Sequence, residues 1–182
     1  MIMHEEALII VDMSNDFIAD EGPLTVGTAG QMIVPYIRDL ADAFLKEENF
    51  VVVAMDAHMP NDSHFDLWPP HNVIGTKGQQ LYGELYDWYQ ANKQNKKVID
   101  CPKTNYNAFF QTHLSETLRN ANVRTVHVVG VATDICVFST VSGADAEGFH
   151  TVTYKQGTAT FTDLGEMMMD HMKRCFHTNV IE

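Results

Sequence analysis

One segment of the chain combines a carboxylate with several imidazole side chains. Asp56 and His58 alternate at the end of an apolar run, so both side chains can point to the same side. His64 and His71 follow in one proline-containing stretch. Carboxylate oxygens and imidazole nitrogens are ligands for Zn, Fe, Mn and Ni ions. A lone His is more often structural, but three His and an Asp after one strand end predict a metal site.

A cysteine occurs where a helix is expected to follow a strand. Cys136 lies just beyond the strongly apolar run 126–131. The positive end of a helix dipole favours a thiolate at that point, and backbone N–H groups there could bind an oxyanion. Cys136 is therefore either a nucleophile or a packed small apolar residue. The other two cysteines are predicted to be structural, because Cys101 precedes a proline and Cys175 falls on an expected helix core face.

Further charged residues follow apolar runs. Asp12 could either cap a helix or point into the crevice at a strand end, whereas Asp16 is better suited to a cap or a structural hydrogen bond. Lys103 also follows a short apolar run; such a lysine is usually exposed, and it matters for chemistry only beside a buried carboxylate and a thiol. Phe17 could belong to the core or to a pocket wall. The scattered histidines are predicted to have no function: His4, His113, His127, His150 and His177.

Short apolar runs alternate with segments of helical spacing. Strands are predicted at 7–11, 51–54, 98–99, 126–131 and 151–154, and helices at 31–45, 81–89, 110–118 and 135–146. A capping-box pattern at Asp163 and Glu166 predicts a last helix that buries Leu164, Met167, Met168, Met172 and Cys175. This alternation predicts one domain over residues 1–182, a three-layer αβα, Rossmann-like, mostly parallel sheet with helices on both faces. Ligands of such sheets bind beyond the carboxyl ends of the strands.

The composition excludes several classes of partner. Among 182 residues, 12 are Lys or Arg and 24 are Asp or Glu, giving a net charge of −12. A chain this acidic is a poor ligand for nucleic acid or an anionic membrane, and no apolar run is long enough to cross a bilayer. The absence of a signal-peptide pattern and the odd number of cysteines predict a reduced, cytoplasmic protein. The glycine-rich motifs of dinucleotide- and phosphate-binding loops and the serine-hydrolase elbow are missing.

Several specific motifs nevertheless occur together, and in them the sequence resembles the nicotinamidases of the isochorismatase-like cysteine hydrolase superfamily. The resemblance covers most of the chain. It is carried by Ile9-Ile10-Val11-Asp12 with Asn15-Asp16-Phe17, Asp56-Ala57-His58, Trp68-Pro69-Pro70-His71 with Gly75-Thr76, Lys103 with Tyr106 and Ala108-Phe109, and Gly130-Val131-Ala132-Thr133-Asp134-Ile135-Cys136.

The resemblance implies hydrolysis of nicotinamide to nicotinate and ammonia, in NAD salvage, through a thioester on the cysteine. It implies a catalytic triad of Asp12, Lys103 and Cys136. It also implies a cis peptide bond before Ala132 and an oxyanion hole made by the backbone N–H groups of Ala132 and Cys136.

The resemblance further implies one divalent metal ion, most often Zn with Fe or Mn as alternatives, and a homo-oligomer. The ligands would be Asp56, His58, His64 and His71, with Asp62 and Asp66 competing for the place of His64. Phe17, Trp68 and Tyr106 would bind the substrate.

Two other functions remain open at this stage. Another enzyme of the superfamily could act on isochorismate or on a different small amide, but no Arg falls in the site segments to meet an anionic substrate. A metal-binding or scaffolding protein with a vestigial site would not need Asp12, Lys103 and Cys136 together.

Overall fold

A six-stranded parallel sheet forms the centre of the protein. The computed structural model describes residues 5–182, so His4 lies outside the described residues. The strands are arranged in the order β3-β2-β1-β4-β5-β6, and every neighbouring pair is parallel. Their bounds are β1 Glu5–Val11, β2 Phe50–Asp56, β3 Val98–Lys103, β4 Val123–Val131, β5 His150–Ala159 and β6 Asn179–Ile181. The predicted fold class is confirmed, and all five predicted strands are present.

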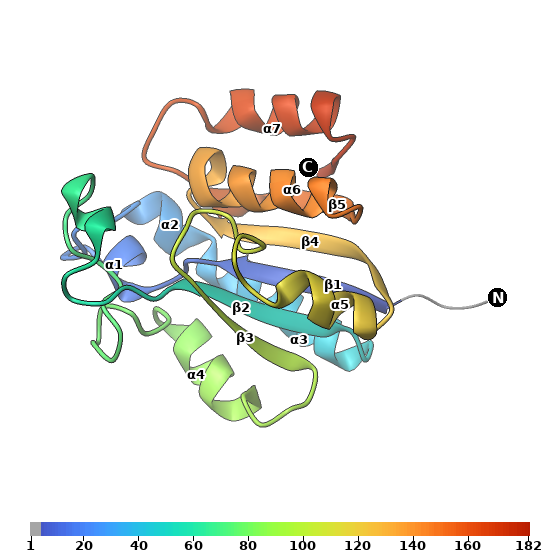
Figure 1. Cartoon of the computed structure of the whole chain (residues 1–182), viewed down its shortest axis with the longest axis horizontal. Coiled ribbons are helices and arrows are strands. Elements are labelled where there is room, and N and C mark those ends of the chain that lie inside the picture. The colour runs from blue at the N-terminus through green and yellow to red at the C-terminus, as the bar shows by residue number, and fades with distance from the viewer. Residues whose placement is uncertain (1–4) are drawn as a thin grey trace.

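Helices cover both faces of this sheet (Figure 1). One face packs its apolar side chains against α3 (Val34–Lys46) and α4 (Glu84–Asn92), with Leu8 and Ile10 in the same cluster as Ile37. The other face packs against α5 (Leu114–Asn120), α6 (Phe138–Ala146) and α7 (Gly165–Cys175), with Ile9 and Val11 in the same cluster as Val141. Alternate residues of β1 therefore serve the two cores, which is why its sequence is apolar throughout.

Several helix bounds differ from those predicted. The pattern at 31–45 is divided between α2 (Thr28–Met32) and α3, and 110–113 forms turns before α5. The segment predicted as one helix from 135 begins instead as a π-helical turn, η2 (Thr133–Val137), and continues as α6. β6 was not predicted, because three half-exposed residues carry no clear alternation.

The prediction for the last helix was wrong in two respects. Its N-cap residue is Leu164, without a side-chain cap, so Asp163 and Glu166 form no capping box. Its buried residues are Met169 and Met172, whereas Leu164, Met167 and Cys175 are exposed. Because three methionines follow one another at 167–169, the sequence does not determine which side of the helix faces the sheet. In the structure the side that carries Met169 and Met172 is buried. Cys175 is therefore not a core residue.

The carboxyl ends of the strands lie at one edge of the molecule, together with α1 (Asn15–Ile18) and the loop after β2 (Figure 1). A close approach of β4 to β1 fixes part of this edge: a Cβ at Gly130 would lie 2.1 Å from the carbonyl oxygen of Val11. Gly130 also has a positive φ of 113°, which only glycine adopts without strain. This contact brings Asp12 close to the turn that carries Cys136. Among the described residues, no helix has the length and apolar character needed to span a membrane.

Candidate active site

Two carboxylates share one buried ammonium group at the ends of the first three strands. The Nζ atom of Lys103, the last residue of β3, lies 2.6 Å from Asp12 Oδ2 and 2.6 Å from Asp56 Oδ1. Lys103 is 1% exposed and Asp12 is 0% exposed. The second oxygen of Asp12 accepts a 2.8 Å hydrogen bond from the backbone N–H of Asp56. Asp12 thus points into the strand-end crevice and caps no helix, and Lys103 is not the surface residue that lysines usually are.

Burial and charge set the protonation of these groups. Burial raises the pKa of Asp12 to about 6, with a contribution from Asp56, while Lys103 opposes the shift. Burial would also raise the pKa of Asp56, but the charge of Lys103 and the nearby His58 and His71 side chains outweigh it and hold that pKa well below its usual range. Burial acts to lower the pKa of Lys103, and the two carboxylates more than reverse this. The trio therefore carries one net negative charge at neutral pH.

Cys136 is buried in the η2 turn and faces the same carboxylate. A hydrogen bond links its thiol to Asp12. Burial raises the pKa of Cys136 well above its ordinary value, although Lys103 acts in the opposite direction. The helix position alone predicted a favoured thiolate, whereas burial at this site favours the neutral thiol, which then needs a base to remove its proton. The peptide bond between Val131 and Ala132 is cis, as the family resemblance implied.

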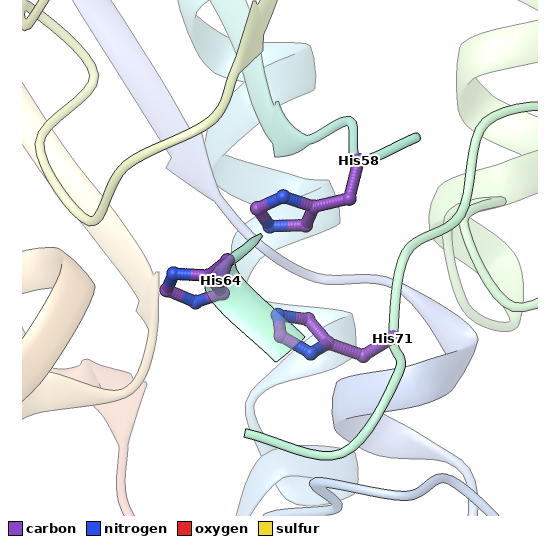
Figure 2. Close-up of side chains that lie close together, drawn as sticks. All are labelled: His58, His64 and His71. Carbon is purple, nitrogen blue, oxygen red and sulfur yellow. The ribbon is translucent and has the colours of Figure 1, made fainter. Parts of the chain in front are cut away.

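Three histidines converge beside Asp56. His58, His64 and His71 come from separate turns of the loop after β2, and their rings face a common centre (Figure 2). The possible ligand nitrogens of all three lie within 4.8 Å of one another. Asp56 Oδ2 lies 3.6 Å from His58 Nε2 and 3.5 Å from His71 Nε2. The predicted ligands are thus together, and Asp56 can face Lys103 with one oxygen and a metal ion with the other.

Neighbouring groups hold these rings in place. His58 Nδ1 bonds to Asp62 Oδ2 at 2.9 Å, and His71 Nδ1 lies 2.8 Å from the carbonyl oxygen of Pro69. Asp62 also accepts a 2.9 Å hydrogen bond from the backbone N–H of His64. Asp62 therefore orients two histidines and does not compete with them, and Asp66 is exposed. His58 Nε2 is buried without a hydrogen-bond partner among the described residues, which fits a metal ligand.

A pocket opens over Cys136 and the histidines. Its lining includes the residues predicted to bind the substrate, namely Phe17, Trp68 and Tyr106, together with Ala132 of the predicted oxyanion hole. The indole N–H of Trp68 donates to the Tyr106 hydroxyl at 2.9 Å, so each ring fixes the other. Phe17 packs edge-on against His71 with ring centroids 5.2 Å apart. Aromatic side chains thus line the pocket that contains the nucleophile.

Sequence reasoning missed four apolar residues of this pocket: Leu24, Val26, Ile135 and Phe161. Ile135 could have been found from its place in the Cys136 motif, but the others lie on loops without a period. Asp16 has the structural role that was predicted, since it accepts a 2.7 Å hydrogen bond from the backbone of Asn72. Cys101 is buried beside Ala108, outside the pocket.

Comparison with known proteins yields related chains along almost the whole length. A sequence model of the isochorismatase domain matches residues 6–181. The isochorismatase family protein PncA of Bacillus subtilis (strain 168) is 40% identical over 164 residues, which cover 88% of this chain and 90% of that protein. The crystal structure of the nicotinamidase/pyrazinamidase PncA from Bacillus subtilis has a TM-score of 0.95 at 37% identity and covers 98% of this chain and 100% of its own.

A more distant solved structure holds a metal. The pyrazinamidase of Pyrococcus horikoshii in complex with zinc has a TM-score of 0.86 at 26% identity, and the match covers 98% of this chain and 99% of that one.

Proposed function

Because this chain belongs to the isochorismatase family, we propose that it hydrolyses the carboxamide of nicotinamide to nicotinate and ammonia. The observation that carries the proposal is one pocket lined by Cys136, whose thiol is hydrogen-bonded to a buried carboxylate, by aromatic side chains, and by two members of the cluster of three histidines. Nicotinamide has an amide for the cysteine, a flat ring for the aromatic side chains and a ring nitrogen for the metal end. The nicotinamidase/pyrazinamidase of Bacillus subtilis shares this fold.

In the triad, Asp12 acts as the base, Cys136 as the nucleophile and Lys103 as the balancing cation. Asp12, ionised above its pKa of about 6, takes the proton of the neutral Cys136 thiol. The thiolate attacks the amide carbon, and the negative charge moves to the amide oxygen. Lys103 stays positively charged and balances Asp12 as that carboxylate gains and loses the proton. Backbone N–H groups of Ala132 and Cys136 stabilise the oxyanion, where one such donor is worth about 3 kcal/mol.

Asp12 then protonates the leaving group and later accepts a proton from the attacking water. Asp12 gives its proton to the amide nitrogen, the C–N bond breaks, and ammonia leaves a thioester on Cys136. A water molecule attacks the thioester carbon and passes a proton to Asp12. Collapse of that second intermediate breaks the C–S bond, the sulfur takes the proton back from Asp12, and the product acid loses its own proton to water and leaves as nicotinate. Buried surroundings strengthen each of these charge interactions because water is excluded.

The metal site fits one divalent cation held by Asp56, His58, His64 and His71. The unpaired buried nitrogen of His58 and the net negative charge of the buried trio both favour a cation there. Three imidazoles and one carboxylate suit zinc, with iron or manganese as alternatives. When bound, the ion supplies a docking point for the pyridine nitrogen, directly or through water. Phe17 and Trp68 hold the ring between them so that the amide lies over Cys136.

Ammonia release from nicotinamide by reduced, zinc-loaded protein tests the proposal. We expect turnover by the unsubstituted protein and by Cys175→Ala, whose sulfur is exposed on α7, but none by Cys136→Ala. Equal activity of all three proteins would refute the nucleophile assignment. Release from another small amide, but not from nicotinamide, would refute the substrate and keep the chemistry.

Assembly and location follow the same proposal. We place the enzyme in the cytoplasm as a homo-oligomer with a small-molecule substrate and no nucleic-acid or membrane partner. Light scattering coupled to size-exclusion chromatography measures the assembly directly, and a monomeric mass would contradict it.

A further inference from the structure

A half-exposed aromatic side chain contributes to the pocket without a part in the chemistry above. Phe161 is 50% exposed, yet it lines the pocket that contains Cys136. It lies in the loop between β5 and α7, which is hydrogen-bonded to η2. An apolar ring on a loop has no directional bond to hold it there, so its position depends on its neighbours.

Both neighbours of Phe161 are tied to one carboxylate. The hydroxyl of Thr160 lies 2.5 Å from Asp134 Oδ1, and the hydroxyl of Thr162 lies 2.7 Å from Asp134 Oδ2. The backbone N–H of Thr162 also donates to the Thr160 hydroxyl at 3.3 Å. Asp134 belongs to the η2 turn, two residues before Cys136. One side chain of the nucleophile turn thus holds the loop on both sides of Phe161, and we call this set of three side chains the threonine clamp.

The start of α7 also contacts the two threonines of the clamp. A Cβ at Gly165 would lie 3.0 Å from Thr160 Cγ2, so the start of the helix packs closely against the Thr160 side chain. The hydroxyl of Thr162 accepts a 3.1 Å hydrogen bond from the backbone N–H of Leu164. Thr160 is therefore held by its hydrogen bond to Asp134 and by packing against Gly165, and Thr162 by hydrogen bonds to Asp134 and Leu164.

We propose that Phe161 is a specificity-determining residue of the pocket and that Asp134 is a positioning residue that holds it there through the hydroxyls of Thr160 and Thr162. This inference rests on the proposed function and deepens it by naming the substrate class. Phe161 lies with Leu24, Val26 and Ile135 in the pocket lining, which makes this wall apolar. Such a wall favours a small neutral aromatic amide and disfavours an amide that carries a carboxylate, because the charged group would lose its water without a partner.

Steady-state kinetics can distinguish a role of the clamp in positioning Phe161 from a role in stabilising the fold. A ring wall contacts the substrate equally in the ground state and in the transition state, so losing it raises KM and leaves kcat nearly unchanged. We expect Phe161→Ala to raise KM for nicotinamide ~10-fold, as apolar pocket contacts commonly do. The double variant Thr160→Val and Thr162→Val should raise KM in the same direction. Thr160→Ser with Thr162→Ser keeps both hydroxyls and should retain the KM of the unsubstituted protein.

Combining the substitutions decides whether the clamp acts through Phe161. If it does, adding the two valines to Phe161→Ala raises KM no further, because the residue they would release is already gone. Additive effects on KM, or a fall in kcat with KM unchanged, would overturn the proposal.

A second measurement does not depend on the substrate. We would follow the labelling of Cys136 by N-phenylmaleimide and by the smaller iodoacetamide, using mass spectrometry to separate it from Cys101 and Cys175. Phe161→Ala and the double valine variant should speed labelling by the bulky reagent more than by the small one. Equal acceleration with both reagents, or none, would overturn the placement of Phe161. Absence of nicotinamide turnover in the unsubstituted protein would refute the proposed function alone, and the labelling would still decide the role of the clamp.

Discussion

Replacing Lys103 by Met removes the one cation that two buried carboxylates share. Methionine keeps most of the volume of the side chain, so the change is mainly one of charge. Nζ lies 2.6 Å from both Asp12 and Asp56, and none of the three groups has access to bulk water to replace it. Removing one partner of a buried ion pair costs ~3–5 kcal/mol. That is a large part of the ~5–15 kcal/mol by which a domain is stable.

The expected effect on thermal unfolding follows from the length of the chain. For a domain of this size each kcal/mol lowers Tm by about 2–4 °C, so Lys103→Met should lower Tm by about 6–20 °C. The variant should also lose turnover, because Lys103 lowers the pKa of Asp12 and without it Asp12 holds its proton more firmly. Zinc should restore part of the lost Tm, since a cation at Asp56 and the histidines supplies positive charge to the same carboxylates.

Circular dichroism melting and ammonia release measure these effects. Lys155→Met is the matched control, because Lys155 pairs with Glu182 at 2.8 Å on the surface and water screens that pair. The control should keep both the Tm and the turnover of the unsubstituted protein. A Lys103→Met protein with unchanged Tm and unchanged turnover would refute the account of a charge-balanced buried trio.

Three further predictions concern the metal end of the pocket. His71→Ala should lower zinc content and raise KM together, whereas His150→Ala, at an exposed position, should change neither; full zinc occupancy in His71→Ala would show that the ligand set is wrong. Asp62→Ala removes the 2.9 Å bond that orients His58 and should weaken zinc affinity by ~10–100-fold in an indicator competition assay, and undiminished affinity would contradict its orienting role. Pyrazinamide should be hydrolysed, because it keeps both the amide and the ring nitrogen, but benzamide poorly, because it lacks that nitrogen; comparable rates on benzamide would argue against ring docking at the metal.

The sequence by itself determined the class of fold and the position of the site. Apolar runs such as 7–11 and 126–131 are typical of central strands, and their spacing leaves room for covering helices. Because the carboxyl ends of parallel strands meet at one edge, Asp12, Asp56 and Cys136 had to lie along the same edge of the sheet. These are local or topological rules, so they hold without knowledge of side-chain packing.

Only the tertiary structure decided how the converging groups interact. The placement of β3 beside β2 brings Lys103 onto both carboxylates, and no local pattern encodes which strands are neighbours. Burial raises the pKa of the Cys136 thiol, against the expectation from its helix position, because desolvation depends on everything packed around it. The positions of Asp62 beside His58 and of Phe161 in the pocket lining likewise depend on loops without periodicity. The paths of such loops are determined by contacts with residues far away in the sequence. The periodicity of apolar residues determines where the buried strands and helices lie. The charge balance of the site and the lining of the pocket depend on contacts between residues far apart in the chain, which only the tertiary structure shows.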